Sequence, residues 1–521
     1  MTHIDIDNLS NDAKVLKELL WNFAQRNELL QHQLFLMRRQ RYGSSSEKLS
    51  SPQQTFEFVR EDAEEDLPDP QAEQRQERAE GKKSGKRPGR RPLPPDLPRE
   101  VILHELPESE RVCPCCQKLM EKFGEEVSEE LHYIPAQAQV RRHVRYKYAC
   151  QKCHEGVQTA PAPMKVVEQG MASAATVATV LVDKFDDHLP LYRQSERFAR
   201  LGIEISRGTL CSWVGQGAER LRPLWDWMCA QVVKSPVVWT DDTPVQVQEP
   251  GRGKTRTARF WIYVGADEYP YVVFDYTANR SRDGPEKFLK NFNGYLQADA
   301  YRGYDGICAG PNVIEAACWA HARRKFFDAK HIDPRAHEML SLISELYAIE
   351  DQARPVLLQA RAKPEPERAV ALTQAYALRQ QLRELKSRPV LEKIQVWLKT
   401  RRLVTLPKSP LGQAVQYALN QWKALNRFVE NGMLEIDNNT AERGLREVAL
   451  GRKNWMFLGN DASGERAAII YSIIASCKRH GVNPWQYLED VLIRISTHPA
   501  SRIEELLPQN WQRLFGSAKP S

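Results

Sequence analysis

The sequence predicts a multidomain α+β protein, and three observations support this fold class. A heptad repeat near the N-terminus is typical of a coiled coil. Two Cys-x-x-Cys pairs follow with the spacing of a tetrahedral zinc site. Beyond residue 231, apolar residues alternate between the periods of strands and helices, as in an α/β domain. At 521 residues the chain is long enough for several such domains.

Composition excludes some classes of protein. The apolar content of 42% suffices for packed cores, and the net charge of +7 is only mildly basic. There is no run of 18 apolar residues, so no membrane span or membrane partner is expected. The N-terminus lacks the charged and then apolar pattern of a signal peptide. We therefore expect a cytoplasmic protein whose ten cysteines serve as thiols or metal ligands.

Residues 1–42 are predicted to form a coiled-coil helix. Two rows of mostly apolar residues repeat every seven positions, namely Leu9, Leu16, Phe23, Leu30 and Met37, and Ala13, Leu20, Asn27 and Leu34. Asn27 at a core position would favour a parallel homodimer in one register. The alternative is a single amphipathic helix that packs on its own domain.

Residues 43–100 have the composition of a disordered linker. An acidic stretch precedes a basic one that includes Lys86, Arg87, Arg90 and Arg91, interleaved with Gly and Pro. Extended arms of this kind insert arginines into the minor groove of DNA. A merely solvated run of charge is the alternative.

Residues 101–160 are predicted to bind zinc. Cys113 and Cys116 form one pair, Cys150 and Cys153 the other, and 33 residues separate them. Four thiolates leave no position for water, so this four-cysteine zinc ribbon would be structural, unless the thiols are unrelated. Between the pairs, Arg145 and Lys147 share one face of a short strand, which is either a phosphate-binding surface or a solvated sheet face.

Residues 161–230 are predicted to be helical and to contain a helix-turn-helix. A glycine turn leads to a serine cap and a helix with a polar start. In that motif the first residues of the second helix contact bases, which makes Ser206, Arg207 and Thr209 candidates. Plain helical packing is the alternative.

From residue 231 the pattern suits a mixed five-stranded sheet of the ribonuclease H-like type. Strands are expected at residues 237–240, 258–265, 269–276, 295–299 and 312–317. The first part of this catalytic domain would span 231–330, a helical insertion 331–425, the second part 426–500 and a C-terminal tail 501–521.

Three acidic residues in this domain are the candidate catalytic and metal-binding groups: Asp241, Asp299 and Glu442. Asp241 and Asp299 each follow an apolar run, and the first and fourth strands of such a sheet are adjacent. Buried carboxylates must be paired or hold a cation. Two Mg²⁺ ions held there would support attack on a phosphodiester by water or by a 3′-hydroxyl. Asp242 is the rival of Asp241, but successive strand residues face opposite sides.

Cations cluster around these carboxylates and are candidates for DNA contact. His321, Arg324 and Lys325 share one side of a helix after the last strand, and Arg443, Arg446, Arg452 and Lys453 lie on or beyond the helix of Glu442. Salt bridges on the helix surface are the alternative for each arginine.

These residues resemble the insertion-sequence-66 (IS66) type of bacterial DDE transposase. The motifs that carry the resemblance are Asp241-Asp-Thr-Pro, Leu296-Gln-Ala-Asp-Ala-Tyr-Arg-Gly-Tyr304, Cys318-Trp-Ala-His-Ala-Arg-Arg-Lys-Phe326 and Asp437-Asn-Asn-Thr-Ala-Glu-Arg443. The resemblance implies that Asp241, Asp299 and Glu442 are the catalytic triad with Mg²⁺. It also implies that the substrate is double-stranded DNA, with inverted-repeat element ends and a target, and that accessory proteins of the element act alongside. Two rival functions remain. One is a zinc-containing DNA-binding regulator with a non-catalytic domain, and the other is a nuclease that does not join strands.

Overall fold

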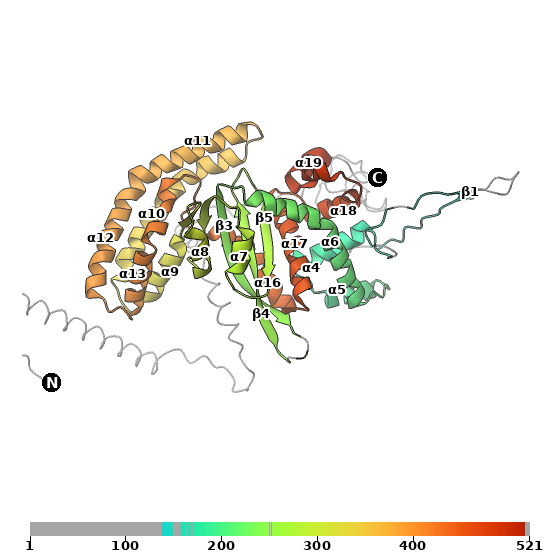
Figure 1. The fold of residues 1–521 in the computed structure, drawn as a ribbon, viewed down its shortest axis with the longest axis horizontal. Helices are drawn as coiled ribbons and strands as arrows, with labels where there is room; N and C mark the ends of the chain where they lie inside the picture. The colour runs from blue at the N-terminus through green and yellow to red at the C-terminus, as the bar shows by residue number, and fades with distance from the viewer. Residues whose placement is uncertain are drawn as a thin grey trace, which may run out of the picture. The chain divides into compact units, whose positions relative to one another are not determined.

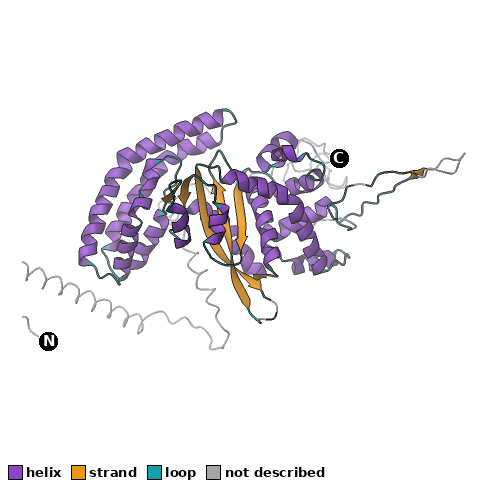
Figure 2. Cartoon of the chain, in the orientation of Figure 1, coloured by secondary structure: helices purple, strands orange, loops and turns teal. Residues whose placement is uncertain are grey.

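The computed structural model describes residues 138–148, 158–162, 164–167, 170–249, 251 and 253–515 (Figures 1 and 2). The predicted coiled coil, the linker with its basic arm and the four zinc cysteines lie outside the described residues, so these predictions stand untested by the structure. The helices and strands of the described residues lie after His143, in a part of the chain that belongs to one compact unit.

The first described part of this unit is mainly helical, as predicted for residues 161–230. It contains a two-stranded antiparallel ladder and three helices: β1 (Lys147–Tyr148), β2 (Gln158–Thr159), α4 (Ala174–Phe185), α5 (Leu191–Arg200) and α6 (Arg207–Val232). The Ser206 hydroxyl caps α6 by accepting from the Thr209 amide at 3.1 Å. Helix α6 is longer than the predicted recognition helix because Leu221, Leu224 and Met228 continue its buried stripe.

The central sheet has the five strands expected from the sequence, in the order β5-β4-β3-β6-β7. Their bounds are β3 (Val237–Gln248), β4 (Thr255–Gly265), β5 (Val272–Thr277), β6 (Gly294–Gln297) and β7 (Val313–Ala316). Strands β3, β4 and β5 are antiparallel neighbours, whereas β6 and β7 run parallel to β3. A sixth strand, β8 (Phe457–Leu458), pairs in parallel with the end of β3.

Strand β3 is three times the length expected. Asp241 therefore lies within the strand and not at its end. Residues 241–248 continue the strand because Thr243, Val245 and Val247 alternate with less buried neighbours. Pro244 is tolerated here because the edge of β3 between β6 and β8 is not paired with another strand.

Helices pack on the sheet and continue to Phe515. They are α7 (Asp283–Phe288), η3 (Arg302–Tyr304), α8 (Asp305–Cys308), α9 (Trp319–Ala329), α16 (Asn439–Trp455), α17 (Asp461–Arg479), α18 (Pro484–Arg494), η5 (Ala500–Leu506) and α19 (Pro508–Phe515). Helix α17 packs on β5, where the Ser472 hydroxyl accepts from the Phe274 amide at 2.7 Å. The segment expected as a tail from residue 501 is folded through Phe515 and buries Trp511.

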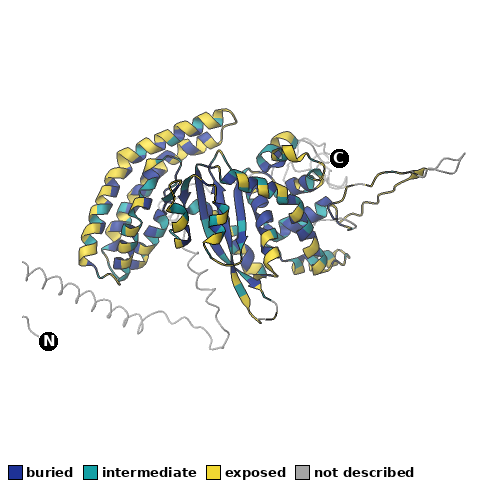
Figure 3. Cartoon of the chain, in the orientation of Figure 1, coloured by how far each residue is buried: buried dark blue, intermediate teal, exposed yellow. Residues whose placement is uncertain are grey.

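The predicted insertion is helical. It contains α10 (Ala336–Arg361), α11 (Glu367–Leu382), the π-helical turn η4 (Arg383–Ser387), α12 (Arg388–Val404), α13 (Pro410–Asn420), α14 (Trp422–Leu425) and α15 (Arg427–Glu430). Buried and exposed residues alternate along these helices, as Figure 3 shows. Helices α10 and α13 pack against α9 of the sheet domain. Within the described residues, every helix is too short or too polar to cross a lipid bilayer.

Candidate active site

Asp241 lies on β3, and Asp299 lies in the bend that follows the neighbouring parallel strand β6. The last paired residues of β3 and β6 are Trp239 and Gln297, and each aspartate lies two residues further along its chain. Side chains two residues apart on a strand share a face. The carboxyl end of β6 therefore brings the two predicted aspartates to one place, where the chain leaves the sheet.

Helix α16 carries Glu442 along the unpaired edge of β3. At its start, the Asn438 side-chain amide donates to the Thr240 carbonyl at 2.9 Å. Near its end, Arg452 donates to the Thr243 hydroxyl at 2.9 Å and to the Pro244 carbonyl. These bonds at both ends hold the helix of Glu442 against the strand of Asp241.

A glycine allows this close approach. A Cβ atom at Gly444 would lie 2.2 Å from Cδ1 of Ile262, which is too close for any real contact. Ile262 is the β4 residue directly opposite Asp241. A side chain at position 444 would therefore force either the buried Ile262 side chain or helix α16, which carries Glu442, to shift.

The surroundings of Asp241 oppose its negative charge. Burial raises its pKa well above the ordinary value of 3.8, and the charges of Asp299, Asp242 and Glu442 raise it further. The Asp242 amide donates to its carboxylate at 2.8 Å, which offsets only part of this effect. No arginine, lysine or histidine among the described residues forms an ion pair with Asp241. A carboxylate crowded in this way fits a site that holds a cation.

Asp242, the rival ligand, is already paired with two arginines. Arg259 and Arg280 contact its carboxylate at 3.1 Å and 2.7 Å, and its side chain is only 2% exposed. Burial still raises its pKa, although both arginines act to lower it. The Arg280 guanidinium stacks 4.2 Å from the centre of the Tyr301 ring. These contacts favour Asp241 over Asp242 as the candidate ligand.

Arg280 is a residue that sequence reasoning missed. It lies after β5, and its positive charge acts on both Asp242 and Asp299. Its side chain keeps 40% of its surface exposed, so it can face a bound phosphate. No local pattern marks this arginine, because its aspartate partner is 38 residues earlier in the chain.

His321 faces the third carboxylate. Its Nδ1 atom lies 3.6 Å from Oε1 of Glu442, and neither atom forms a hydrogen bond within the described part of the chain. The Cys318 thiol belongs to the same group, since the three ligand atoms lie within 4.8 Å of one another. The backbone amide of Asn438 donates to the Cys318 sulfur at 3.2 Å, and burial raises the pKa of this thiol well above its usual range.

The structure brings some predicted DNA contacts to the surface and buries one. Arg443, Arg446 and Lys453 are exposed on α16, and Lys325 is exposed on α9 while Arg324 is half-buried. Arg452 is only 2% exposed, and its bonds to β3 give it a structural role. The prediction that Arg452 contacts DNA is therefore not supported, because it continues the buried stripe of Leu445 and Val448.

The remaining predicted contacts lie in the N-terminal part of the unit. Arg145 and Lys147 are exposed, and Arg145 donates to the Ala160 carbonyl at 2.7 Å. Arg207 is exposed at the start of α6, whereas the hydroxyls of Ser206 and Thr209 lie 2.9 Å apart within the helix cap. Lys86, Arg87, Arg90 and Arg91 lie outside the described residues.

Comparison with known proteins identifies the family. The model of the IS66 transposase family matches residues 169–466, which is more than half of the chain and includes all three carboxylates. The chain belongs to the IS66 family of transposases. Models of the IS66 zinc-finger domain and of the IS66 C-terminal element match residues 110–154 and 472–509. A model described as transposase C of IS166 homeodomain matches residues 29–102.

These matches confirm the resemblance seen in the motifs. The zinc-finger match contains all four predicted cysteine ligands and supports a structural zinc ion. As an IS66 transposase, the protein has DNA as its partner. Two uncharacterized proteins of Sinorhizobium fredii are similar over most of their length. The protein y4jD is 37% identical over 436 residues, 81% of each chain, and y4hP is 34% identical over 445 residues, 81% of this chain and 76% of its own.

Proposed function

We propose that this IS66 transposase binds the inverted-repeat ends of an insertion element and catalyses divalent-ion-dependent strand cleavage and strand transfer, with Asp241, Asp299 and Glu442 as its catalytic triad. One observation carries the proposal. Asp241 is crowded by Asp299 and Glu442, which come from distant parts of the chain, and no described cation neutralises it. Such a cluster is unfavourable unless it holds a metal ion.

The topology supports a ribonuclease H-like catalytic domain. Three antiparallel strands are followed by two parallel ones, and the first and fourth strands of the five are adjacent. The helical insertion separates the last strand from the helix of Glu442 in sequence, while α16 still packs on β3 and β4. This arrangement allows a carboxylate 143 residues after Asp299 to reach the same site.

The donor set fits a hard divalent cation such as Mg²⁺. Carboxylate oxygens are the protein ligands that Mg²⁺ prefers, and Asp241, Asp299 and Glu442 would hold it. When bound, a pair of such ions activates the attacking oxygen and stabilises the leaving one. The nearby Asp242 is less suited to this task, because Arg259 and Arg280 already occupy its carboxylate.

The side chains around the triad would orient the DNA. Arg280, held by Asp242 and Tyr301, presents a fixed guanidinium beside the carboxylates and is suited to contact a phosphate oxygen. In cleavage, water attacks phosphorus, the bond from phosphorus to the 3′ oxygen breaks, and a 3′-hydroxyl is left. In joining, that hydroxyl attacks a target phosphodiester and displaces the 3′ oxygen there.

The N-terminal regions would recognise the element ends. Helices α5 and α6 provide the helix-turn-helix with Arg207 at its base-facing start, and the zinc ribbon and basic arm would add phosphate contacts. The heptad region would make the protein a homodimer that can bring two ends together. We place the protein in the cytoplasm and on the nucleoid, acting with accessory proteins of the same element.

A nicking assay tests the triad. The substrate is a labelled duplex with one element end, in Mg²⁺ buffer. We expect Asp241→Asn, Asp299→Asn and Glu442→Gln each to reduce nicking by at least about a thousandfold while end binding in a gel shift stays near wild type. Asp328→Asn, an exposed aspartate on α9, is the matched control and should nick normally.

The same assay separates the rival functions. A triad variant that nicks at the parental rate would remove that residue from the catalytic site. Wild-type protein that binds ends but never nicks with any divalent ion would favour the regulator with a non-catalytic domain. Nicking without any joined product would favour the nuclease.

A further inference from the structure

A buried cluster of charges lies inside the helical insertion. Glu350 from α10, Arg379 from α11 and Arg383 from η4 are 4%, 6% and 0% exposed. Both arginines contact the Glu350 carboxylate, Arg379 through Nε at 2.9 Å and Arg383 through Nε and Nη2 at 2.6 Å and 2.8 Å. Arginines four residues apart share one side of a helix, so both face the same carboxylate.

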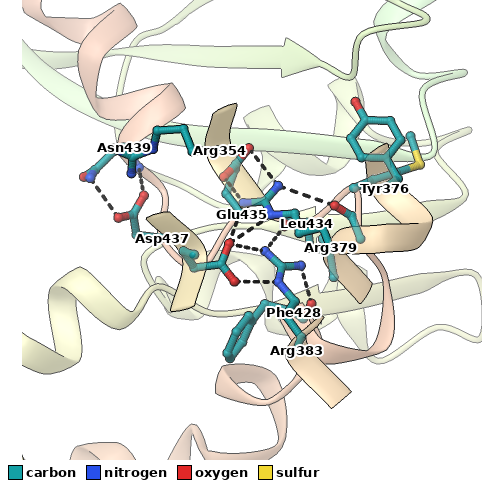
Figure 4. A network of polar contacts seen from close by, with 12 residues as sticks. Arg354, Tyr376, Arg379, Arg383, Phe428, Leu434, Glu435, Asp437 and Asn439 are labelled. Carbon is teal, nitrogen blue, oxygen red and sulfur yellow. Dashed lines mark hydrogen bonds and ion pairs between the residues drawn. The ribbon is translucent and has the colours of Figure 1, made fainter. Parts of the chain in front are cut away.

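The same two arginines also bind the segment that leads from the insertion back to α16. We define this segment, residues 428–438, as the return loop. Arg383 donates to the carbonyls of Phe428, Asn431 and Leu434 at 2.6, 3.0 and 2.8 Å. Arg379 donates to the Glu435 carboxylate at 2.5 Å and 3.3 Å. Figure 4 shows the two guanidinium groups between the helices and this loop.

Arg379 favours the charged form of Glu435. Burial opposes ionisation of this carboxyl group, yet the charge and hydrogen bonds of Arg379 outweigh burial and lower its pKa to about 2. Buried ion pairs often add little to overall stability, because desolvation cancels the attraction. A large buried cluster is therefore better explained by what it holds in place.

The return loop in turn contacts all three segments that carry the triad. The backbone of Glu435 forms two hydrogen bonds with the buried side chain of Gln297, at 2.7 Å and 3.2 Å. Gln297 lies two residues before Asp299. The Asn438 side chain of the loop donates to the Thr240 carbonyl, directly before Asp241. Asn438 is also the residue before α16, and its carbonyl accepts from the Glu442 amide at 3.2 Å.

We propose that the Glu350–Arg379–Arg383 cluster is a positioning device through which the helical insertion fixes the return loop and thereby sets the mutual placement of Asp241, Asp299 and Glu442. The inference rests on the proposed function of these three residues. It makes the insertion a part of the active-site architecture rather than a separate module. Arg379, Arg383, Glu435 and Gln297 are positioning residues, since none of them touches the reacting atoms.

Two mild variants test the device from opposite ends. Glu435→Gln weakens the hold of Arg379 on the loop, and Gln297→Met disconnects the loop from β6 without touching the ion cluster. The matched control is Arg388→Met, which removes an exposed pair with Glu384 in the same insertion. All are made in the full-length chain, and thermal unfolding confirms that each is folded.

The first readout is hydrogen exchange of residues 428–446 without divalent ions. We expect exchange to quicken about tenfold in Glu435→Gln and Gln297→Met, because each loses restraint equivalent to about one hydrogen bond. Arg388→Met should exchange like wild type. Unchanged exchange in Glu435→Gln would overturn the role of the cluster, and unchanged exchange in Gln297→Met would overturn the link from the return loop to β6.

The second readout is Mn²⁺ binding, followed by the loss of the free-ion electron paramagnetic resonance signal. We expect Asp241→Asn to abolish Mn²⁺ binding at this site. Both test variants should weaken Mn²⁺ binding about tenfold, as the loss of residues that support metal ligands commonly does. Their binding to DNA ends should stay within about twofold of wild type. Wild-type Mn²⁺ affinity in both variants would refute the positioning role. If Asp241→Asn itself binds Mn²⁺ like wild type, the proposed triad fails, and hydrogen exchange alone then decides the positioning device.

Discussion

The crowding of Asp241 predicts that its removal stabilises the metal-free protein. Two like charges in contact at an effective dielectric of about 20 repel each other by roughly 4 kcal/mol. Asp241 faces Asp299 and Glu442, and burial adds to the cost of its charge. After relaxation and partial screening, we expect Asp241→Asn to raise the free energy of unfolding by about 1–3 kcal/mol at pH 7 in chelator.

The raised pKa of Asp241 also fixes how this effect depends on pH. The folded pKa of Asp241 lies above the unfolded value near 3.8, so the folded state binds more protons between those two values. Wild-type stability should therefore fall as pH rises from about 4 through the folded pKa, and the advantage of Asp241→Asn should grow over the same window. Above the folded pKa the advantage should be constant.

Chemical denaturation in chelator, at several pH values, measures this difference. Asp333→Asn is a control of opposite sign. Burial opposes the charge of Asp333, but hydrogen bonds from Arg335 outweigh it and lower its pKa, so its removal should destabilise the protein. If Asp241→Asn is no more stable than wild type at pH 7, the picture of uncompensated carboxylates is wrong.

Three further outcomes are expected. Gly444→Ala should lower the free energy of unfolding by about 1–3 kcal/mol and slow nicking. Adding Ile262→Val removes the clashing methyl group and should restore both stability and nicking, as denaturation and nicking assays would show. Failure of this rescue would contradict the close-approach argument. Burial lowers the pKa of His480 from 6.5 to about 4, so its contribution of about 3 kcal/mol is present above pH 6.5 and is lost as pH falls toward 4. His480→Gln should flatten that part of the stability profile, and an unchanged slope would refute the assignment. Arg207→Ala should weaken end binding and reduce the salt slope of log K by about 1, whereas an unchanged slope in gel shifts would show that Arg207 makes no phosphate contact.

Much of the sheet domain was predictable from periodicity. The five strands occur where apolar runs and alternation place them, and the first and fourth are adjacent as expected. The length of β3 was misjudged, because Asp241, Asp242 and Pro244 resemble a strand end. The alternation of Thr243, Val245 and Val247 carried the correct information, since a strand paired with neighbours tolerates polar residues on its less buried face.

The candidate site was predictable only in part. The three carboxylates stood out because each follows or begins a recognisable element, whereas the pairing of Asp242 with Arg259 and Arg280 depends on contacts between distant segments. The burial of Arg452 was readable in principle, because it falls on the helical stripe of Leu445 and Val448. Its positive charge concealed this, since arginines are seldom fully buried unless paired.

The charge cluster of the insertion had no readable signature. Glu350, Arg379 and Arg383 lie in a stretch rich in Glu, Arg and Lys, where nearly every charged residue of an amphipathic helix is solvated. Only the folded arrangement shows that these three face inward and bind backbone carbonyls. Local periodicity cannot report such contacts, because their partners lie on other helices and in the return loop.

The order of segments along the chain has a consequence during synthesis. A ribosome adds roughly 5–20 residues per second, so about 7–30 seconds separate the emergence of Asp299 from that of Glu442. Throughout this interval the nascent polypeptide already contains the zinc-finger segment and the sequence of helices α5 and α6 but lacks Glu442. Products of premature termination within the insertion should therefore occupy element ends without cutting them, and should act as dominant inhibitors of the full-length protein.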